Sequence, residues 1–154
     1  MRKLLFLFAL IVSAFTFVAH AQVADKDAVR VPLENYIKAH ATGDPEFARK
    51  AFHTEGNMIW IRDGNYSSET FDSFIKRAFT GKPAADEAIR KEGRKIESID
   101  VTGNAAVAKI VLDYPTVKFV DYMTLLKING EWKIINKSFF AEPKAKPAES
   151  KNAQ

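Results

Sequence analysis

The sequence contains no cysteine and only three histidines. The absence of cysteine excludes a disulfide framework and a lipid-anchored N-terminal cysteine. It also lacks a G-x-S-x-G elbow, a glycine-rich phosphate loop and an H-E-x-x-H pair, so the common hydrolase, nucleotide and zinc-protease signatures are missing. Beyond the N-terminal segment only His40 and His53 remain, whereas a catalytic zinc needs about three protein ligands. We therefore expect no metal site and no cofactor, and assign no catalytic residue from motifs.

The N-terminal segment has the pattern of a secretory signal. Arg2 and Lys3 give a basic start, residues 4–18 are mostly apolar, and the small residues "AHA" follow at 19–21. The apolar run is shorter than the roughly 18 to 20 residues that a membrane-spanning helix needs. We predict a signal peptide over residues 1–21 and a mature chain without a membrane anchor. The protein is then exported, either periplasmic or secreted.

The charges of the chain form no stripe of one sign. The sequence has 23 basic and 19 acidic residues, and removal of Arg2 and Lys3 with the signal leaves an excess of two positive charges. Bases and acids alternate, as in "DEAIRKEGRKIESID", which is unlike the continuous basic surface that a phosphate backbone requires. We therefore expect no nucleic-acid partner.

The C-terminal residues 141–154, "AEPKAKPAESKNAQ", contain no large apolar side chain. Such a segment cannot bury enough surface to offset its ordering entropy, which predicts a disordered tail. No internal repeat or linker interrupts the rest. The sequence thus predicts one folded domain over residues 22–140.

Helical spacing of apolar residues predicts a helix over residues 27–42. Asp44 and Pro45 predict the start of a second, short helix, with His53 at its end. Residues 57–62 are typical of a strand that is closed by a turn at Asp63 and Gly64. Ser67 or Ser68 then caps a third helix, whose buried side chains we expect to be Phe71, Phe74, Ile75, Ala78 and Phe79.

From Lys95 onward the sequence favours strands alone. Four runs rich in β-branched and aromatic residues follow one another, and hairpin turns are predicted at Gly103-Asn104 and Asn129-Gly130. Helices gathered toward one end of the chain and antiparallel strands toward the other indicate an α+β domain with a single core.

Three segments carry a resemblance to a known family: "YIKAHATGDPEFARKAFH", "IESIDVTGNAAVAKI" and "DYMTLLKINGEWKIINK". They resemble the nuclear transport factor 2-like (NTF2-like) superfamily, which includes ketosteroid isomerase and the SnoaL-like cyclases, and within it the putative lumazine-binding family. The resemblance implies a cone-shaped fold in which N-terminal helices pack on a curved antiparallel sheet. This fold hosts enzymes, ligand binders and assembly modules, so function must be argued from the site.

The isomerase provides a specific comparison, because it uses a tyrosine on the first helix, an aspartate on a late strand and a carboxylate base on the first strand. The resemblance places Tyr36 at the tyrosine position and Asp121 near the late aspartate. Trp60 occupies the position of the base. Because indole cannot accept a proton, the resemblance implies that the isomerase reaction lacks its central step.

Alternation along the last strand predicts which side chains face the cone. One face carries Asn136 together with apolar residues, and the other carries Lys133 and Lys137. Asp121 stands among apolar neighbours, so it is either a ligand anchor or one half of an internal pair with Lys118 or Lys137. The candidate ligand-binding residues are Tyr36, His53, Trp60, Asp121 and Asn136.

We expect a noncatalytic domain that binds a small, flat ligand in an apolar cavity. One alternative is a cofactor-free enzyme of the isomerase, dehydratase or cyclase type, with Asp121 and His53 as its acid/base pair. The other is a structural dimerisation module whose cavity is filled by its own aromatic residues. The final strands carry apolar residues on both faces, which predicts a homodimer through the outer face of the sheet. These residues are Leu125, Leu126, Ile134, Ile135, Phe139 and Phe140.

Overall fold

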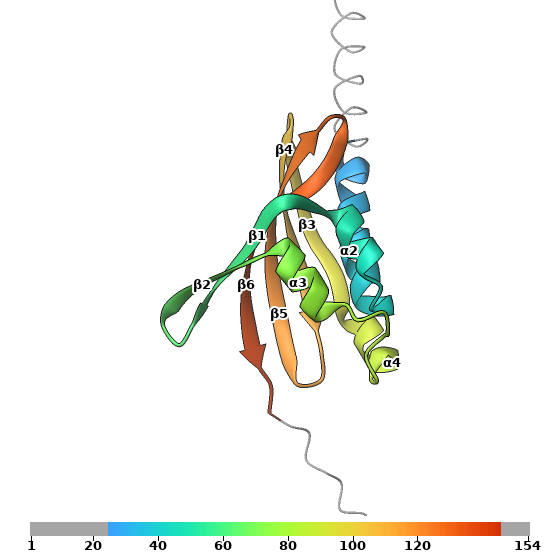
Figure 1. Ribbon diagram of the computed structural model, residues 1–154, viewed down its shortest axis with the longest axis vertical. Coiled ribbons are helices and arrows are strands. Elements are labelled where there is room, and N and C mark those ends of the chain that lie inside the picture. The colour runs from blue at the N-terminus through green and yellow to red at the C-terminus, as the bar shows by residue number, and fades with distance from the viewer. Residues whose placement is uncertain (1–24, 146–154) are drawn as a thin grey trace, which may run out of the picture.

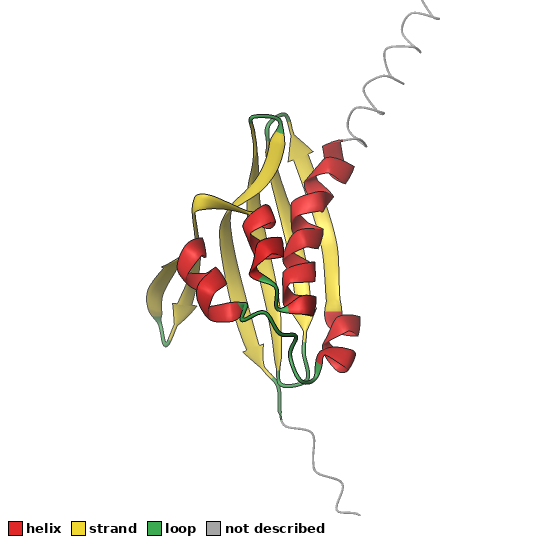
Figure 2. Ribbon diagram, turned by 45° about the vertical axis from the view of Figure 1, so that its right-hand side comes forward, coloured by secondary structure: helices red, strands yellow, loops and turns green. Residues whose placement is uncertain are grey.

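The computed structural model describes residues 25–145 as an α+β fold. Helices cover one face of a six-stranded sheet, and none of the described residues forms a helix on the other face (Figures 1 and 2). This arrangement confirms the fold class expected from the sequence. The predicted signal peptide at residues 1–21 and the tail beyond residue 145 lie outside the described residues.

The N-terminal helix is described over residues 25–42, as its apolar spacing predicts. Its inner side chains, Val29, Leu33, Tyr36 and Ala39, are wholly buried against the sheet. Gly43 ends the helix in the left-handed region, with φ of +70°, and a Cβ there would collide with the backbone of Lys82. Glycine is therefore required at this turn. The helix places Tyr36 over the centre of the sheet.

Helix α2 (Pro45–Ala51) ends earlier than predicted. Asp44 caps its start by accepting a hydrogen bond from the backbone N–H of Glu46 at 2.9 Å. Strand β1 (Phe52–Arg62) begins at once, because the Phe52 ring stacks on Phe71 with 4.0 Å between centroids and the Phe52 backbone pairs with Ile134. His53 is consequently a strand residue and does not end a helix.

Strand β2 (Asn65–Thr70) corrects the predicted start of the third helix. Asp63 and Gly64 both have positive φ and form a tight hairpin turn, as predicted. Antiparallel pairing then continues to Thr70, so Ser67 and Ser68 are in a strand and cap no helix. Thr70 caps α3 (Phe71–Ala78), accepting from the N–H of Ser73 at 3.3 Å. Of the expected stripe only Ala78 is exposed.

The remaining elements are α4 (Glu87–Arg90), the 3-10 turn η1 (Lys91–Gly93), β3 (Arg94–Thr102), β4 (Ala105–Asp113), β5 (Val117–Ile128) and β6 (Glu131–Pro143). The strand order is β2-β1-β6-β5-β4-β3, and every pair is antiparallel except β1 with β6. The predicted turns at 103–104 and 129–130 join β3 to β4 and β5 to β6. Strand β6 runs three residues past the predicted end of the domain, because residues 141–143 pair with β5.

A bulge in β6 decides which side chains face the helices. Leu125 of β5 pairs with Ile134 and Thr124 pairs with Asn136, so Ile135 is an extra residue. An extra residue reverses the alternation beyond it. Trp132 and Ile134 face the core before the bulge, and Lys137 is buried there after it. The predicted facing was therefore wrong beyond Ile135: Asn136 lies on the outer face and Lys137 on the inner one.

Candidate functional site

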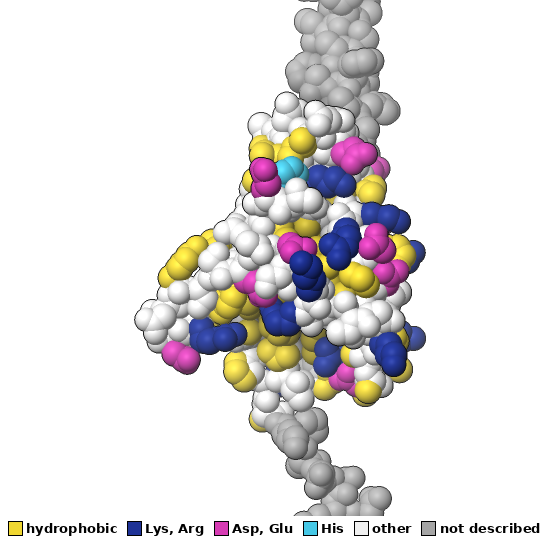
Figure 3. Space-filling view, viewed as in Figure 1, with side chains coloured by type: hydrophobic (Ala, Val, Ile, Leu, Met, Phe, Trp, Pro, Cys, Tyr) yellow, Lys and Arg dark blue, Asp and Glu magenta, His cyan; other side chains and the backbone are white. Residues whose placement is uncertain are grey.

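A cavity of about 580 Å³ lies between the N-terminal helix, α3 and the inner face of the sheet. We call it the cone cavity. Its walls are mainly aromatic and aliphatic, and hydrophobic side chains with Lys and Arg beside them are visible next to the β1–β2 hairpin (Figure 3). Residues that line it include His40, Trp60, Phe74, Phe119, Lys137 and Phe139.

Three buried polar side chains from three elements meet at the cone cavity. The Tyr36 hydroxyl donates to Oδ2 of Asp121 at 2.7 Å, and Nζ of Lys137 donates to the Tyr36 hydroxyl at 3.2 Å. Lys137 and Asp121 also form an ion pair, with 3.6 Å between Nζ and Oδ2. Tyr36 and Asp121 are wholly buried and Lys137 is 4% exposed. Of the alternatives left open for Asp121, the structure thus contains the internal pair, with Lys137 as the partner.

Burial sets the protonation of this cluster. It raises the pKa of Tyr36 well above its ordinary value of 10.0, and the neighbouring Asp121 carboxylate raises this pKa further. Tyr36 therefore keeps its proton and donates a hydrogen bond to Asp121. Burial lowers the pKa of Lys137, while the attraction of Asp121 opposes that change. A desolvated lysine of this kind holds its proton less firmly than a lysine in water.

Two ring nitrogens at the cone cavity have no hydrogen-bond partner in the part of the chain that the structure describes. They are Nε2 of His40 and Nε1 of Trp60, both shielded from solvent. Burial lowers the pKa of His40 to about 3, so its imidazole is neutral at physiological pH. Buried polar atoms almost always have partners. Both nitrogens belong to residues that line the cavity, so they are the polar atoms whose hydrogen bonding a ligand there would complete.

The structure brings together three of the five predicted site residues. Tyr36 and Trp60 line the cone cavity, and Asp121 lies directly behind Tyr36. His53 lies at a separate hollow of about 310 Å³, because β1 begins before it. Asn136 faces the other side of the sheet, where its amide donates to Oδ1 of Asn57 at 2.8 Å. The early end of α2 and the bulge in β6 explain these two placements.

Sequence reasoning did not select His40 or Lys137. A signal for His40 was present, since it lies four residues after Tyr36 on the same helical stripe and therefore on the same face. Lys137 was named only as a possible partner of Asp121 and not as a residue of the cavity. Strict alternation put it outside the cone, and a bulge at an Ile-Ile-Asn stretch leaves no mark in residue type.

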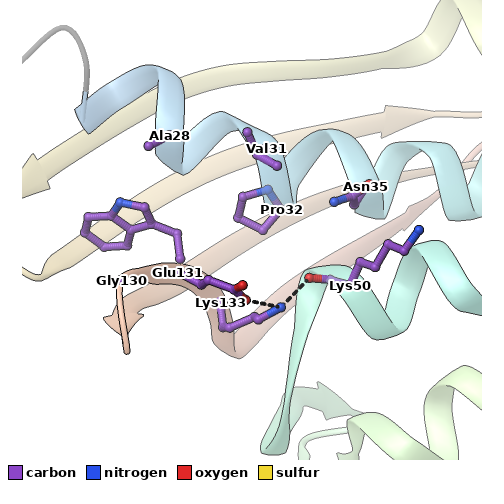
Figure 4. Close-up of a pocket in the computed structure, with 9 residues that line it drawn as sticks. Ala28, Val31, Pro32, Asn35, Lys50, Gly130, Glu131 and Lys133 are labelled. Atoms are coloured by element: carbon purple, nitrogen blue, oxygen red, sulfur yellow. Dashed lines mark hydrogen bonds and ion pairs between the residues drawn. The ribbon is translucent and has the colours of Figure 1, made fainter.

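A second hollow of about 380 Å³, the helix groove, lies between the N-terminal helix and the β5–β6 turn (Figure 4). Its lysine from β6 is already paired: Nζ of Lys133 donates to the carbonyl oxygen of Lys50 at 3.1 Å and lies 3.3 Å from Glu131. The cone cavity is therefore the better candidate site. Over residues 25–145 no group of three or more His, Asp or Glu is placed to hold a metal, and no helix is long and apolar enough to cross a membrane.

Comparisons with known proteins give the same fold. An NTF2-like protein of unknown function from Shewanella baltica superposes with a TM-score of 0.68 at 23% identity, covering 79% of this chain and 97% of the other. One from Methylobacillus flagellatus gives 0.65 at 25% identity, covering 78% and 94%. A curated relative from Cladobotryum, named aldolase FrzH, is 24% identical over 131 residues, which is 81% of this chain and 98% of that protein.

The family model described as "putative lumazine-binding" matches residues 24–140. The match spans every described element up to the last residues of β6. The chain therefore belongs to the putative lumazine-binding family and has the NTF2-like fold.

Proposed function

We propose that this domain binds a small, flat, partly polar molecule in the cone cavity. The observation that carries the proposal is that two residues lining this aromatic hollow, His40 and Trp60, each hold a ring nitrogen that has no hydrogen-bond partner over residues 25–145. The cavity volume of about 580 Å³ lies within the usual range of small-molecule sites. An aromatic wall with a few fixed polar atoms selects flat molecules whose edge can form hydrogen bonds.

Native mass spectrometry of protein purified from its own compartment tests this proposal. We expect a small molecule that remains bound in the gas phase and is released on denaturation. Calorimetric titration with naphthalenemethanol, a flat aromatic alcohol, provides an independent test with protein that has been stripped by unfolding and refolding. Failure to retain any molecule, together with failure to bind this probe, would contradict the proposal.

A second candidate is catalysis on a carbonyl compound, favoured by the relative that is named an aldolase. The acid/base pair of Asp121 with His53 is not available for it, since His53 lies at another hollow. Tyr36, His40 and Lys137 are the titratable groups at the cone cavity that such chemistry would use. Retro-aldol cleavage of a naphthyl β-hydroxyketone, followed through the fluorescence of the aldehyde released, tests it. Wild-type activity no greater than that of free lysine would exclude it.

We also propose a homodimer through the outer face of the sheet. Leu125 and Ile134 are buried and Phe139 packs on the core, whereas Leu126 and Phe140 are exposed. Tyr122 and Val107, each 55% exposed, extend the apolar surface. Sedimentation should show a dimer at micromolar concentration, and Tyr122→Lys should convert it to a monomer. A monomeric wild-type protein would exclude this interface.

Export is proposed from the segment before residue 22, with cleavage after "AHA". N-terminal sequencing of the natural protein should begin at Gln22. A natural protein that begins at Met1 would exclude the cleavage.

A further inference from the structure

We propose that Lys137 is a nucleophile that captures aldehydes or ketones in the cone cavity as an imine. This inference rests on the proposed function, because the carbonyl compound is the ligand that the cavity binds. It narrows that ligand to hydrophobic, preferably aromatic, carbonyl compounds.

The amine of Lys137 is at the cavity and enclosed by aromatic rings. Its side chain is 5% exposed and lines the cone cavity. Nζ lies 4.7 Å from the ring centroid of Phe139, 5.0 Å from that of Phe74 and 5.4 Å from that of Tyr36. An aromatic aldehyde that packs against these rings has its carbonyl carbon within the region that Nζ can reach.

Burial raises the share of free amine above that of a lysine in water, and the free amine is the form that attacks a carbonyl. Desolvation lowers the pKa of Lys137, and the positive charge of Arg77 lowers it further, while Asp121 and Glu69 act in the opposite direction. Lysines that are desolvated in apolar pockets form Schiff bases for this reason. The Asp121 carboxylate, 3.6 Å from Nζ, then lies where it stabilises the positive charge of a protonated imine.

The reaction balances without any other reagent. Nζ adds its lone pair to the carbonyl carbon, and the oxygen takes up one hydrogen of the amine to give a carbinolamine. The Tyr36 hydroxyl, 3.2 Å from Nζ, is placed to pass that proton. Loss of the hydroxyl with the second amine hydrogen forms the C=N bond and releases one water. Both hydrogens of the amine leave on the former carbonyl oxygen, so nothing is oxidised or reduced.

Lys133, the other lysine of β6, has different surroundings from Lys137. It lies before the bulge, at the helix groove, and its Nζ bonds to the backbone carbonyl of Lys50 and to the exposed carboxylate of Glu131. Within the described residues its Nζ has none of the ring contacts that surround Lys137, and its side chain is 26% exposed. Lys133 is therefore the matched control for Lys137.

The test is reductive trapping with naphthaldehyde and cyanoborohydride at neutral pH. Intact mass should rise by one naphthylmethyl group, and peptide mapping should place it on Lys137. Lys137→Arg keeps the positive charge but cannot form an imine, so we expect the adduct to fall at least about tenfold. Lys133→Arg should label like the wild type. The labelling rate should also level off at a lower pH than that of Nα-acetyl-lysine, whose side-chain amine is free in water.

Naphthalenemethanol has the shape of the probe without its electrophilic carbon, and it separates the two proposals. If the alcohol binds and peptide mapping of the wild-type protein finds no adduct on Lys137, imine formation is excluded and the binding proposal stands. If neither molecule binds, both proposals fail. Label spread evenly over exposed lysines would equally exclude a special role for Lys137. Mapping on the wild-type protein keeps the test valid if Lys137→Arg fails to fold.

Discussion

The cone cavity and the helix groove each contain a tryptophan with an unpartnered indole nitrogen and a lysine from β6. In the groove, Lys133 is paired with Glu131, whose side chain is 73% exposed. In the cavity, Lys137 is paired with Asp121, which is wholly buried. The two lysines, four positions apart on one strand, thus have different environments.

Both lysines have an ion pair, so burial, and not the presence of an ion pair, makes Lys137 the more reactive of the two. Water screens the charges of Lys133 and Glu131, so their pairing contributes little to stability. Lys137 and Asp121 have lost their hydration and depend on each other and on Tyr36. Desolvation also weakens the hold of Lys137 on its proton. The predictions below test this contrast.

The largest expected effect is that of removing Asp121. Asp121→Ala leaves the amine of Lys137 buried without its anion, so the free energy of unfolding should fall by about 3–5 kcal/mol. Glu131→Ala removes the partner of Lys133 and should change it by less than about 0.5 kcal/mol. Urea unfolding of both variants measures the difference. Equal losses would show that the two pairs do not differ as the structure indicates.

A double variant serves as the control for that experiment. Asp121→Leu with Lys137→Met removes both charges and fills their space, so it should recover more than half of the loss caused by Asp121→Leu alone. Recovery should be incomplete, because the Tyr36 hydroxyl loses its acceptor, at a cost of about 1–3 kcal/mol. No recovery at all would mean that packing, and not the unpaired charge, causes the loss.

The next effect is acid destabilisation through His40. Its pKa in the folded protein is about 3, below its ordinary value of 6.5, so between these pH values the unfolded chain binds more protons. Stability is therefore lost as the pH falls from 6.5 toward 3, by about 1.4 kcal/mol per pH unit and about 4 kcal/mol in all. His40→Phe should flatten the dependence of the unfolding free energy on pH.

His53→Phe is the matched control, because His53 lies outside the cone cavity. It should keep the wild-type dependence on pH. Identical curves for His40→Phe and the wild-type protein would contradict the assignment to His40.

A smaller effect is expected on ligand affinity. Trp60→Ala removes part of the aromatic wall and should weaken the binding of naphthalenemethanol by about 1–3 kcal/mol. Val31→Ala changes the helix groove instead and should leave this affinity unchanged. Titration calorimetry compares the two variants. The reverse result would move the binding site from the cavity to the groove.

The smallest effect concerns Asn136. Its amide bonds to Asn57 on the outer face, so Asn136→Ala should lower the unfolding free energy by about 0.5–1.5 kcal/mol. Affinity for naphthalenemethanol should not change, because the side chain does not reach the cone cavity. A loss of affinity without a loss of stability would return Asn136 to the site.

Much of the fold was predictable from local patterns. The stripe of Leu33, Tyr36 and His40 has helical spacing, and the pairs Gly103-Asn104 and Asn129-Gly130 indicate turns through their tolerance of positive φ. These signals lie within a few neighbouring residues. The start of β1 and the whole of β2 were not predictable in this way, because the polar run "NYSSET" becomes a strand only by pairing with β1.

For the site, the sequence predicted that Tyr36, Trp60 and Asp121 share one interior, through the helical stripe of Tyr36 and through the resemblance that places Trp60 and Asp121. It also determined that no cysteine or histidine cluster could provide the chemistry. Only the tertiary structure decided that Lys137 joins them and that Asn136 does not. The bulge at Ile135 results from pairing β6 with both β1 and β5. Because this pairing depends on residues of three strands, the sequence of β6 alone does not predict the bulge.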